Sequence, residues 1–490
     1  MSANLLAVSP VLVPLLTAAL TALASGRAGL QKTLSFAGAL TLLGCGLALA
    51  AAAGSGTPAQ SAFGGWALPF GIGFYIDRLG AAMVLITAIM GLASLVFLES
   101  DADPGHASPL RLPLIHGLLA GVGGAFATAD LFNLYVWFEV MLICSLGLLA
   151  MGGGRQHMDG AFKYMVLNLF GTLVLLAAVA LVYGASGHLA YPAIHAAWPQ
   201  VPANVALPVL TLLLISFLVK AGSFPVYAWL PPAYPGLPGG VLALFAGLLT
   251  KVGAYAVLRA MGDVFAPTPQ VLFDALGWVA AATMVFGVLG AAYHWDMRRI
   301  LAFHIVSQIG YILLAVAVGG EQGNAAALFY TIHHIIVKAN LFLVAAIVFR
   351  LTGSYDLRRI GGLYAVRPFV AVLFAIPALS LVGIPPLSGF WSKLLVLQGT
   401  VAQGRWVWTA LALGVSVLTL YSMMKIWMEA FWKPHPQGPA DRPWQPPAHT
   451  RLLPAYVASG ALALLTLAIS FNPQPLLAYA QAAARTLGAP

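Results

Sequence analysis

Charged residues are scarce in this chain. Only 8% of its 490 residues are Asp, Glu, Lys or Arg, whereas 61% are hydrophobic. Soluble domains carry about 25% charged residues, so this composition excludes a soluble fold with a water-facing surface. We therefore expect an all-α polytopic membrane protein, because a helix satisfies its own backbone hydrogen bonds in lipid.

Cysteines and cofactor motifs are also nearly absent. Cys45 and Cys144 both fall in apolar stretches, which excludes a disulfide framework and a CxxC metal site. The sequence contains no nucleotide-binding loop, metal-ligand cluster, haem motif or nucleophile elbow, so we expect no cofactor and no chemical catalysis. The net charge of +9 comes from scattered basic residues, and this pattern argues against nucleic-acid binding.

Hydrophobic stretches long enough to cross a bilayer recur along the whole chain. A crossing helix needs about 20 apolar residues, and this criterion predicts about fourteen spans. They are 4–24, 30–53, 77–98, 110–127, 131–150, 160–184, 204–229, 239–260, 271–293, 299–318, 325–350, 368–400, 406–430 and 452–471. Pro225 should break the seventh span, and Pro385 with Pro386 the twelfth, because proline lacks an N–H and clashes with the preceding turn. Polar connectors are predicted at 101–113 and 433–449, and a weakly amphipathic tail follows the last span.

The loops on the two sides of the membrane differ in charge. Basic residues favour cytoplasmic loops. Alternate loops, starting after the first span, hold Arg27, Lys32, Arg111, Arg155, Lys163, Arg298, Arg299, Arg350, Arg358, Arg359, Arg367, Lys433, Arg442 and Arg451. The opposite loops hold only Arg78, Arg259, Arg405 and Arg485. This asymmetry predicts that the first set is cytoplasmic and that both termini lie on the outer side.

The basic residues left inside the predicted spans are all lysines. They are Lys220, Lys251, Lys338, Lys393 and Lys425. A charge at the bilayer centre costs about 2.5–3.5 kcal/mol, and a buried lysine can lose its proton whereas an arginine effectively cannot. Among the acids, only Glu139 lies well inside a span. This excess of titratable bases favours a proton relay over a cation cage, which would need more oxygen ligands.

Glu139 is the one acid that could pair with these lysines. It lies among large apolar residues in DLFNLYVWFEVMLICSLGLL. If Glu139 meets Lys220 across a helix interface, both can ionise, since charges about 4 Å apart attract by about 4 kcal/mol at an effective dielectric constant of 20. Separating the pair would then favour release of the lysine proton. The alternative is a static ion pair that only fixes helix packing.

Histidines accompany the lysines in the later spans. His334 and Lys338 stand four residues apart and therefore share one helix face. Histidine titrates near neutral pH, so this pair is typical of a proton relay. His333 points to another face, and His304 lies in a polar stretch of the tenth span. A role in packing or hydrogen bonding is the alternative for both.

The lysines near the two proline breaks suggest a repeated unit. Lys220 and Lys251 are separated by almost the same number of residues as Lys393 and Lys425. Paired broken helices in repeated units are typical of transporters. Pro225 follows Lys220, whereas the double proline precedes Lys393, so the repeat is only suggested. Lys425 is equally compatible with a structural pair near Glu429.

Five stretches together resemble the antiporter-like membrane subunit family. They are DLFNLYVWFEV, FLVKAGSFPVYAWLPPAYP, LLTKVGAYAVL, HHIIVKANLFL and GIPPLSGFWSK. This family includes subunits of the Mrp multi-subunit Na⁺/H⁺ antiporters and the proton-pumping membrane subunits of respiratory complex I. The first two stretches look most similar to D-type antiporter subunits.

The resemblance implies a fold of fourteen helices with two inverted five-helix repeats, in which helices 7 and 12 are broken. Residues 1–98 would form helices 1–3, 110–260 the first repeat, 271–430 the second repeat, and 452–490 helix 14 with a short tail. The proton-relay residues carried over by the motifs are Glu139, Lys220, Lys251, His334, Lys338 and Lys393. His333, His304 and Lys425 are further candidates. Some relatives have a histidine where Tyr330 stands, and some complex I relatives have a glutamate in place of Lys393.

The function implied is that of a D-type, proton-translocating subunit of a monovalent cation (Na⁺)/H⁺ antiporter. Such a chain would transport H⁺ and Na⁺ without a cofactor, and would bind other subunits in a bacterial inner membrane. The absence of a long C-terminal extension argues against an A-type subunit. One alternative is a proton-pumping subunit of a redox complex, either NADH:quinone oxidoreductase or a membrane-bound hydrogenase. Another is a scaffold whose buried charges only fix the docking of other subunits.

Overall fold

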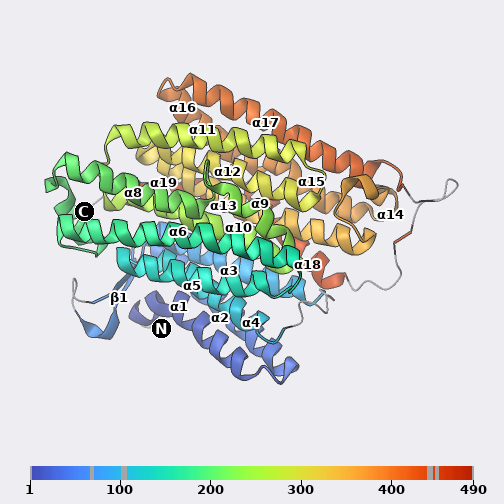
Figure 1. Cartoon of the computed structure of the whole chain (residues 1–490), viewed down its shortest axis with the longest axis horizontal. Coiled ribbons are helices and arrows are strands. Elements are labelled where there is room, and N and C mark those ends of the chain that lie inside the picture. The colour runs from blue at the N-terminus through green and yellow to red at the C-terminus, as the bar shows by residue number, and fades with distance from the viewer. Residues whose placement is uncertain are drawn as a thin grey trace.

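The chain folds into a bundle of long helices with one small hairpin. The computed structural model describes residues 3–66, 71–100, 108–436, 438, 445–446 and 452–487. Most of the predicted connectors 101–113 and 433–449 lies outside these residues, as do Arg442 and Arg451. The helices run side by side along the horizontal axis of Figure 1, and both termini lie towards the end that carries β1.

The elements follow one another along the chain as a nearly unbroken series of helices. These are α1 (Ala3–Leu23), α2 (Ala28–Gly54), α3 (Arg78–Leu98), α4 (Arg111–Ala127), α5 (Leu131–Ala150), α6 (Arg155–Ser186), α7 (Tyr191–Ala197), α8 (Ala203–Ala221), α9 (Leu230–Ala233), α10 (Gly239–Arg259), α11 (Gln270–Tyr293), α12 (Met297–Val318), α13 (Gly320–Thr352), α14 (Leu363–Val366), α15 (Pro368–Val382), α16 (Ser388–Ala402), α17 (Trp406–Ile426), α18 (Leu453–Phe471) and α19 (Gln474–Thr486). Strands β1 (Ala59–Ala62) and β2 (Gly73–Ile76) pair antiparallel.

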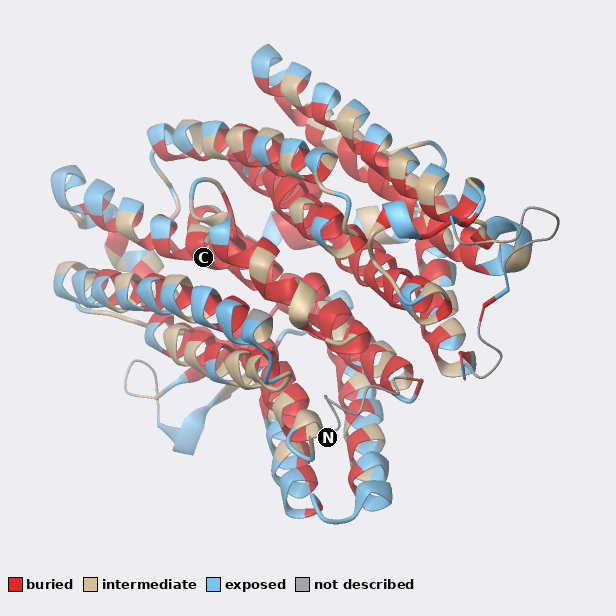
Figure 2. Cartoon of the chain, turned by 45° about the vertical axis from the view of Figure 1, so that its right-hand side comes forward, coloured by how far each residue is buried: buried red, intermediate tan, exposed pale blue. Residues whose placement is uncertain are grey.

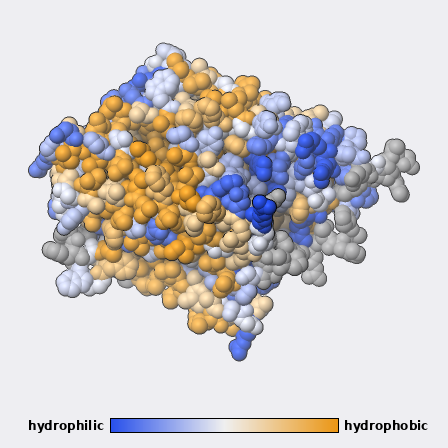
Figure 3. Space-filling model, in the orientation of Figure 1, coloured by the Kyte–Doolittle hydropathy of each residue, from blue (hydrophilic) through white to orange (hydrophobic). Residues whose placement is uncertain are grey.

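The length and composition of these helices make the chain a multi-pass membrane protein. Within the described residues, twelve helices are long and apolar enough to cross a membrane. The shorter apolar helices α4 and α15 fall where two further spans are expected, so the count of fourteen stays a prediction. Figure 3 shows a broad hydrophobic surface between hydrophilic regions at the two ends of the helices. The polar side chains thus lie where loops would meet water.

Both predicted helix breaks are present and have the same local design. Helix α8 ends at Ala221 and is followed by Gly222 with φ 70°. Helix α15 ends at Val382 and is followed by Gly383 with φ 94°. Glycine adopts this left-handed conformation without steric cost, and each glycine stands shortly before a proline. The recurrence is what a repeated unit would produce, and the inverted repeats and their bounds stay predictions.

Helix α10 forms the centre of the bundle. Every residue from Gly239 to Arg259 is buried, and α10 contacts α3, α8, α12 and α13. Figure 2 shows the same pattern for the whole molecule, with buried faces turned inward and exposed faces outward. A side chain on any face of α10 therefore lies inside protein rather than in lipid.

Glycines allow the central helices to approach closely. A Cβ placed on Gly253 would collide with the backbone nitrogen of Ala221, so α10 and the end of α8 touch backbone to backbone. Two glycines of α4, four residues apart, behave likewise: a Cβ on Gly117 or Gly121 would collide with Cys144 or Met141 of α5. Small residues at this spacing are what transmembrane helices use for close packing.

Three elements were not predicted from the sequence. The β1–β2 hairpin and α7 fall in segments that we expected to be loops. The tail after the last span was predicted to be weakly amphipathic, and this is wrong. It forms α19, which buries one face including Ala480 and Ala483 and contacts α3 and α13. Its Arg485 pairs with Glu321 at the start of α13.

We expect Gly253→Ala to destabilise the protein by about 1–3 kcal/mol, because the added methyl collides with the α8 backbone. The matched control is Gly460→Ala in α18, where a Cβ would meet nothing within 4 Å among the described residues. Thermal unfolding of the purified protein in detergent measures the difference. A Gly253→Ala variant as stable as the control would contradict the close α8–α10 contact.

Candidate functional site

Two central helices bring three of the predicted relay residues together. Lys251 lies on α10, and His334 and Lys338 lie on α13; all three are 0% exposed. The charge of Lys251 acts on both His334 and Lys338, which places the three groups within electrostatic reach of one another. Three basic groups thus share one region of the protein interior. The cluster of Lys251, His334 and Lys338 is called the central cluster below.

The central cluster has more hydrogen-bonding capacity than the surrounding side chains use. Lys251 Nζ donates to the carbonyl of Ala246 at 2.5 Å. Within the described residues, Lys338 Nζ and both ring nitrogens of His334 have no hydrogen-bond partner. Buried polar atoms are nearly always hydrogen-bonded in native proteins, and ordered water supplies the partner where protein does not. The geometry therefore favours a hydrated cluster.

Such a cluster can pass protons in a definite way. Adding a second positive charge close to the first raises the energy of both, because the interior screens charge poorly. The arrival of a proton at one group therefore favours departure of a proton from its neighbour. This chemistry needs titratable groups, which lysine and histidine provide and arginine does not.

His304 and His333 connect this region to the later helices. His304 Nε2 lies 2.6 Å from Ser422 Oγ on α17, and the charges of Lys338 and Lys393 both act on this ring. His333 Nδ1 lies 2.8 Å from Ser388 Oγ, at the first residue of α16. Each histidine has one hydrogen-bonded nitrogen, so both are oriented rather than loosely packed.

Lys393 is held at the second helix break. Its Nζ donates to the carbonyl of Val382, the last residue of α15, at 2.8 Å and to Ser416 Oγ at 3.0 Å. It also lies 4.8 Å from the centre of the Tyr311 ring. The break frees a backbone carbonyl that an intact helix would use, and the lysine occupies it.

A pair of stacked tyrosines lies beside Lys393. The rings of Tyr311 and Tyr330 are 5.5 Å apart and nearly parallel. Tyr311 Oη lies 2.8 Å from Ser416 Oγ, which also binds Lys393, and Tyr330 Oη donates to Gln308 Oε1 at 2.6 Å. Tyr330 stands where some relatives have a histidine. It offers a hydroxyl instead, which is bound to Gln308, while its ring stacks on Tyr311.

Glu139 and Lys220 lie near each other, but they form no ion pair. Lys220 Nζ is buried and lies 5.4 Å from the centre of the Phe138 ring; no described residue provides it with a hydrogen-bond partner. The charge of Glu139 acts on Lys220, yet no ion pair within 4.0 Å joins them. The described part of the chain does not fully enclose Glu139. It is half-buried on the outer face of α5, beside the exposed Ile143.

Lys425 has a structural position at the end of the bundle. Its Nζ donates to the carbonyls of Ala292 and His294, at 3.2 and 2.7 Å, where α11 ends. A cation here compensates the free carbonyls of a helix C-terminus. The suggested pair with Glu429 is wrong, because Glu429 binds Lys433.

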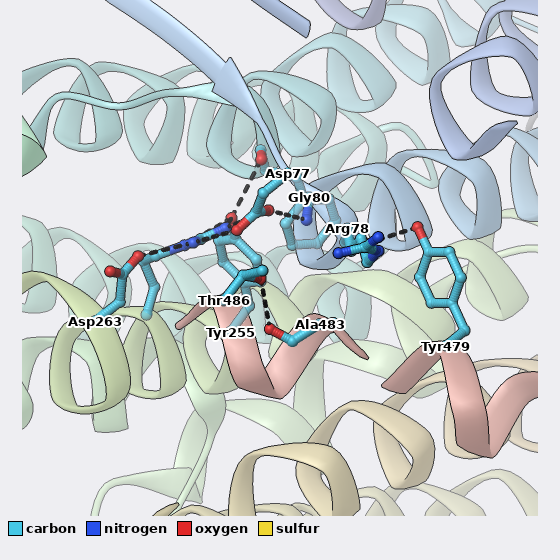
Figure 4. Close-up of polar contacts among 10 residues, drawn as sticks. Asp77, Arg78, Gly80, Tyr255, Asp263, Tyr479, Ala483 and Thr486 are labelled. Atoms are coloured by element: carbon cyan, nitrogen blue, oxygen red, sulfur yellow. Dashed lines mark hydrogen bonds and ion pairs between the residues drawn. The ribbon is translucent and has the colours of Figure 1, made fainter. Parts of the chain in front are cut away.

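A buried arginine was missed by the sequence reasoning. We expected Arg259 in an outer loop and only lysines inside the spans, but Arg259 is the last residue of α10 and its side chain is 7% exposed. Asp77 and Asp263, both labelled in Figure 4, bind its guanidinium. The Asp77 carboxylate binds it with both oxygens, at 2.7 and 2.9 Å, and Asp263 lies at 2.8 Å. Two carboxylates offset the desolvation of one cation.

A signal for this network was present in the sequence. Asp77 begins one apolar span, and Arg259 and Asp263, four residues apart, end another. In the predicted topology, the arginine and the two aspartates therefore lie on the same side of the membrane. Sequence reasoning treats them as loop charges because Asp77 is 182 residues from Arg259, and no local pattern links them.

A polar cavity of about 680 Å³ opens on the side of the predicted cytoplasmic loops. Its lining includes His157, His294, Asp296 and Asp356. Burial lowers the pKa of His294, and the nearby Arg299 lowers it further. The hydrogen bond from Arg358 holds the pKa of the Asp356 carboxyl below its usual value. The cavity also reaches Pro232, in the segment that follows the first helix break.

The chain matches a known protein family over more than half of its length. Residues 128–419 match the family model described as NADH:quinone oxidoreductase/Mrp antiporter, TM. The chain belongs to this family. The match covers both helix breaks and all the predicted relay residues except Lys425, so the resemblance deduced from the motifs is confirmed.

Relatives and solved structures agree with this assignment. The chain is 38% identical over 430 residues to the D-type subunit of the Na(+)/H(+) antiporter of Alkalihalophilus pseudofirmus, covering 88% of this chain and 87% of the relative. It is 33% identical to the corresponding antiporter chain of Bacillus subtilis, over 99% and 97% of the two chains. A chain of the Mrp complex from Dietzia sp. DQ12-45-1b superposes with a TM-score of 0.91 at 34% identity, over 99% and 98%.

Redox complexes contain similar chains at lower identity. A chain of an archaeal membrane-bound sulfane sulfur reductase gives a TM-score of 0.91 at 26% identity, covering 99% of this chain and 98% of that one. A chain of respiratory complex I from Thermus thermophilus gives 0.83 at 26% identity, covering 99% and 100%. The fold is thus common to the Mrp complex and to respiratory membrane complexes.

We expect ordered water at the central cluster. A high-resolution structure of the protein should place water within hydrogen-bond distance of Lys338 Nζ, of His334 and of Lys220 Nζ, because the described residues leave these atoms without partners. Arg259, whose donors all have protein partners, is the internal control and should bind none. Dry surroundings at all three sites would contradict a hydrated path.

Proposed function

We propose that this chain is a D-type subunit of a multi-subunit Na⁺/H⁺ antiporter, in which it carries the protons. The observation that supports this role is the interior position of the ionisable groups. Lys220, Lys251, Lys338 and Lys393 are each at most 5% exposed. They lie on helices α8, α10, α13 and α16, and each of these helices contacts the next in that order. Relatives with the same fold are named as antiporter subunits.

In the proposed mechanism, a proton moves along this row by successive charge repulsion. A proton at Lys220 would be favoured by the nearby charge of Glu139 and would be passed on when that influence weakens. The central cluster would receive it, and His304 with the Tyr311–Ser416 hydroxyls would link the cluster to Lys393. One elementary charge crossing 100 mV is worth about 2.3 kcal/mol. This is comparable with the pairing energy of a carboxylate and a lysine about 4 Å apart, so coupling to ion gradients is physically feasible.

The position of Glu139 supports assembly with other subunits. It lies near the middle of the 20-residue helix α5, on a face shared with Phe132 and Ile143, which are 42% and 65% exposed. A half-exposed carboxylate at this depth is costly in lipid. In the proposed complex a neighbouring subunit covers this face, so the environment of Glu139 depends on the partner.

The placement in the cell forms part of the same proposal. The chain would lie in the inner membrane of a bacterium, with the basic loops in the cytoplasm and both termini outside. The transported ions would be H⁺ and Na⁺, and no cofactor would be needed.

A proton-pumping subunit of a redox complex is the second candidate, because chains of such complexes share the fold. The higher identity to antiporter subunits favours the first candidate. Purification of the tagged protein from its native membrane, with mass identification of the bound subunits, separates the two. Antiporter subunits are expected, and a quinone- or hydrogen-reactive redox module would overturn the assignment.

We expect Glu139→Gln and Lys220→Met each to reduce cation/proton exchange in vesicles at least about tenfold, which corresponds to about 1.4 kcal/mol. Each change removes one charge of the proposed switching pair while keeping side-chain size. Glu99→Gln is the matched control, because Glu99 forms an exposed pair with Lys32 outside the site. Normal exchange by either site variant in a fully assembled complex would contradict the role.

A further inference from the structure

The outer end of α10 carries a row of polar side chains. Lys251, Tyr255, Arg259 and Asp263 recur every fourth residue along this helix and its continuation. Residues four apart lie on one face, so the row leads from the central cluster towards the outer surface. At 1.5 Å per residue, Lys251 and Arg259 are about 12 Å apart along the axis. Only Tyr255 stands between them in this row.

The Arg259 guanidinium is fully engaged. An arginine has five N–H donors, and all of them have acceptors here. Nη1 donates to Asp77 and Asp263, Nη2 to Asp77 and Tyr255, and Nε to Tyr255 at 3.4 Å. Tyr255 Oη in turn donates to the carbonyl of Phe126, at the end of α4, at 3.2 Å. The arginine is therefore held in place from several helices and has no spare donor for water.

A cavity reaches this arginine from outside. It has a volume of about 410 Å³, and its lining includes Tyr75, Asp77, Tyr191, Arg259 and Asp263. His195 also lines this cavity, and its Nδ1 lies 2.9 Å from the backbone carbonyl of Asp263. Figure 4 shows α19 passing beside the network, where Thr486 also lines the cavity. Water and cations entering from this side would thus stop at the ion network.

The inner side of the network differs from the central cluster. Between Lys251 and Arg259 the hydroxyl of Tyr255 is hydrogen-bonded, and none of the described side chains at Tyr255, Arg259 or Asp77 has a buried atom without a partner. Lys338 and His334 do have such atoms. The demand for water therefore ends at Lys251 and does not continue towards the outer cavity.

We propose that Arg259, locked by Asp77, Asp263 and Tyr255, seals the outer end of α10 and prevents direct proton exchange between the outer cavity and Lys251. A guanidinium neither accepts nor releases a proton at physiological pH, and a fixed arginine excludes protons and cations from membrane pores. The seal would force protons to leave by way of Lys393 in the second half of the chain. Arg259 is then a positioning residue for coupling, and this role depends on the proposed proton transport.

The seal is tested by the passive proton permeability of vesicles that contain the intact complex. The variant is Asp77→Asn with Arg259→Gln, which removes both charges of the buried pair and leaves Asp263, whose side chain is 26% exposed, as the remaining charge of the network. We expect collapse of an imposed pH gradient, without transported cation, to become at least about tenfold faster per assembled complex. The matched control is Asp274→Asn with Arg405→Gln, a more exposed pair between α11 and the start of α17, which should keep the wild-type leak.

A third change identifies the route of the leak. Adding Lys251→Met to the double variant should return the leak to the wild-type level, because the proton would lose its next carrier. An assembled double variant without a leak, or a leak that persists after Lys251→Met, overturns the proposal. If the double variant does not assemble, the single variant Tyr255→Phe, which removes one acceptor of Arg259, takes its place. We expect its proton leak per complex to be about two- to threefold faster than that of the wild type. A Tyr255→Phe complex with the wild-type leak overturns the seal.

These outcomes are distinct from failure of the transport role itself. Cation-dependent exchange by the wild-type complex is measured in the same vesicles. Its absence would reject the antiporter assignment, whereas the leak comparison concerns only the barrier at Arg259. A purely structural role for Arg259 would lower the amount of assembled complex and leave the leak per complex unchanged.

Discussion

The organisation of this protein depends on the cost of placing positive charge in a medium that screens it poorly. An unpaired buried charge is unfavourable by several kcal/mol, and the chain buries several basic groups with few acids to balance them. The helix that carries the central lysine is surrounded by protein on every side. Close contacts at Gly253 and at the glycines of α4 make this possible, since they bring helices together without intervening side chains.

The chain solves the charge problem in two different ways. At Arg259, two carboxylates and a tyrosine satisfy every donor, and the charge is permanent and immobile. At Lys338 and His334, partners are missing among the described side chains, and the groups can exist without charge. An arginine whose donors all have partners suits a barrier to protons, and a lysine without hydrogen-bond partners suits proton transfer. Arg259 and Lys251, which borders the unsatisfied groups, lie about two turns apart on the same helix.

The sequence predicted the parts of this arrangement that depend on local pattern. Apolar length located the helices, the prolines located both breaks, and the spacing of His334 and Lys338 correctly put them on one helix. Contacts between distant segments could not be predicted in this way. Asp77 and Arg259 meet only because α3 and α10 pack together, and Lys425 binds carbonyls at the end of α11 rather than the acid one turn away. Arg259 stands at the very end of its span, and no local pattern shows that this end is buried.

The two broken helices carry their lysines on opposite sides of the break in sequence: Lys220 comes before Gly222, and Lys393 after Gly383. In Figure 1, however, α9 lies to the right of α8, whereas α16 lies to the left of α15, so the two broken helices run in opposite directions. The order of lysine and break along the chain is reversed between the two helices, and so is the direction of the helix, so the two reversals cancel. The helix segments α8 and α16, which carry Lys220 and Lys393, therefore extend from their breaks towards the same end of the bundle. A voltage across the membrane would thus meet two lysine-bearing segments of the same orientation, although the broken helices to which they belong run in opposite directions.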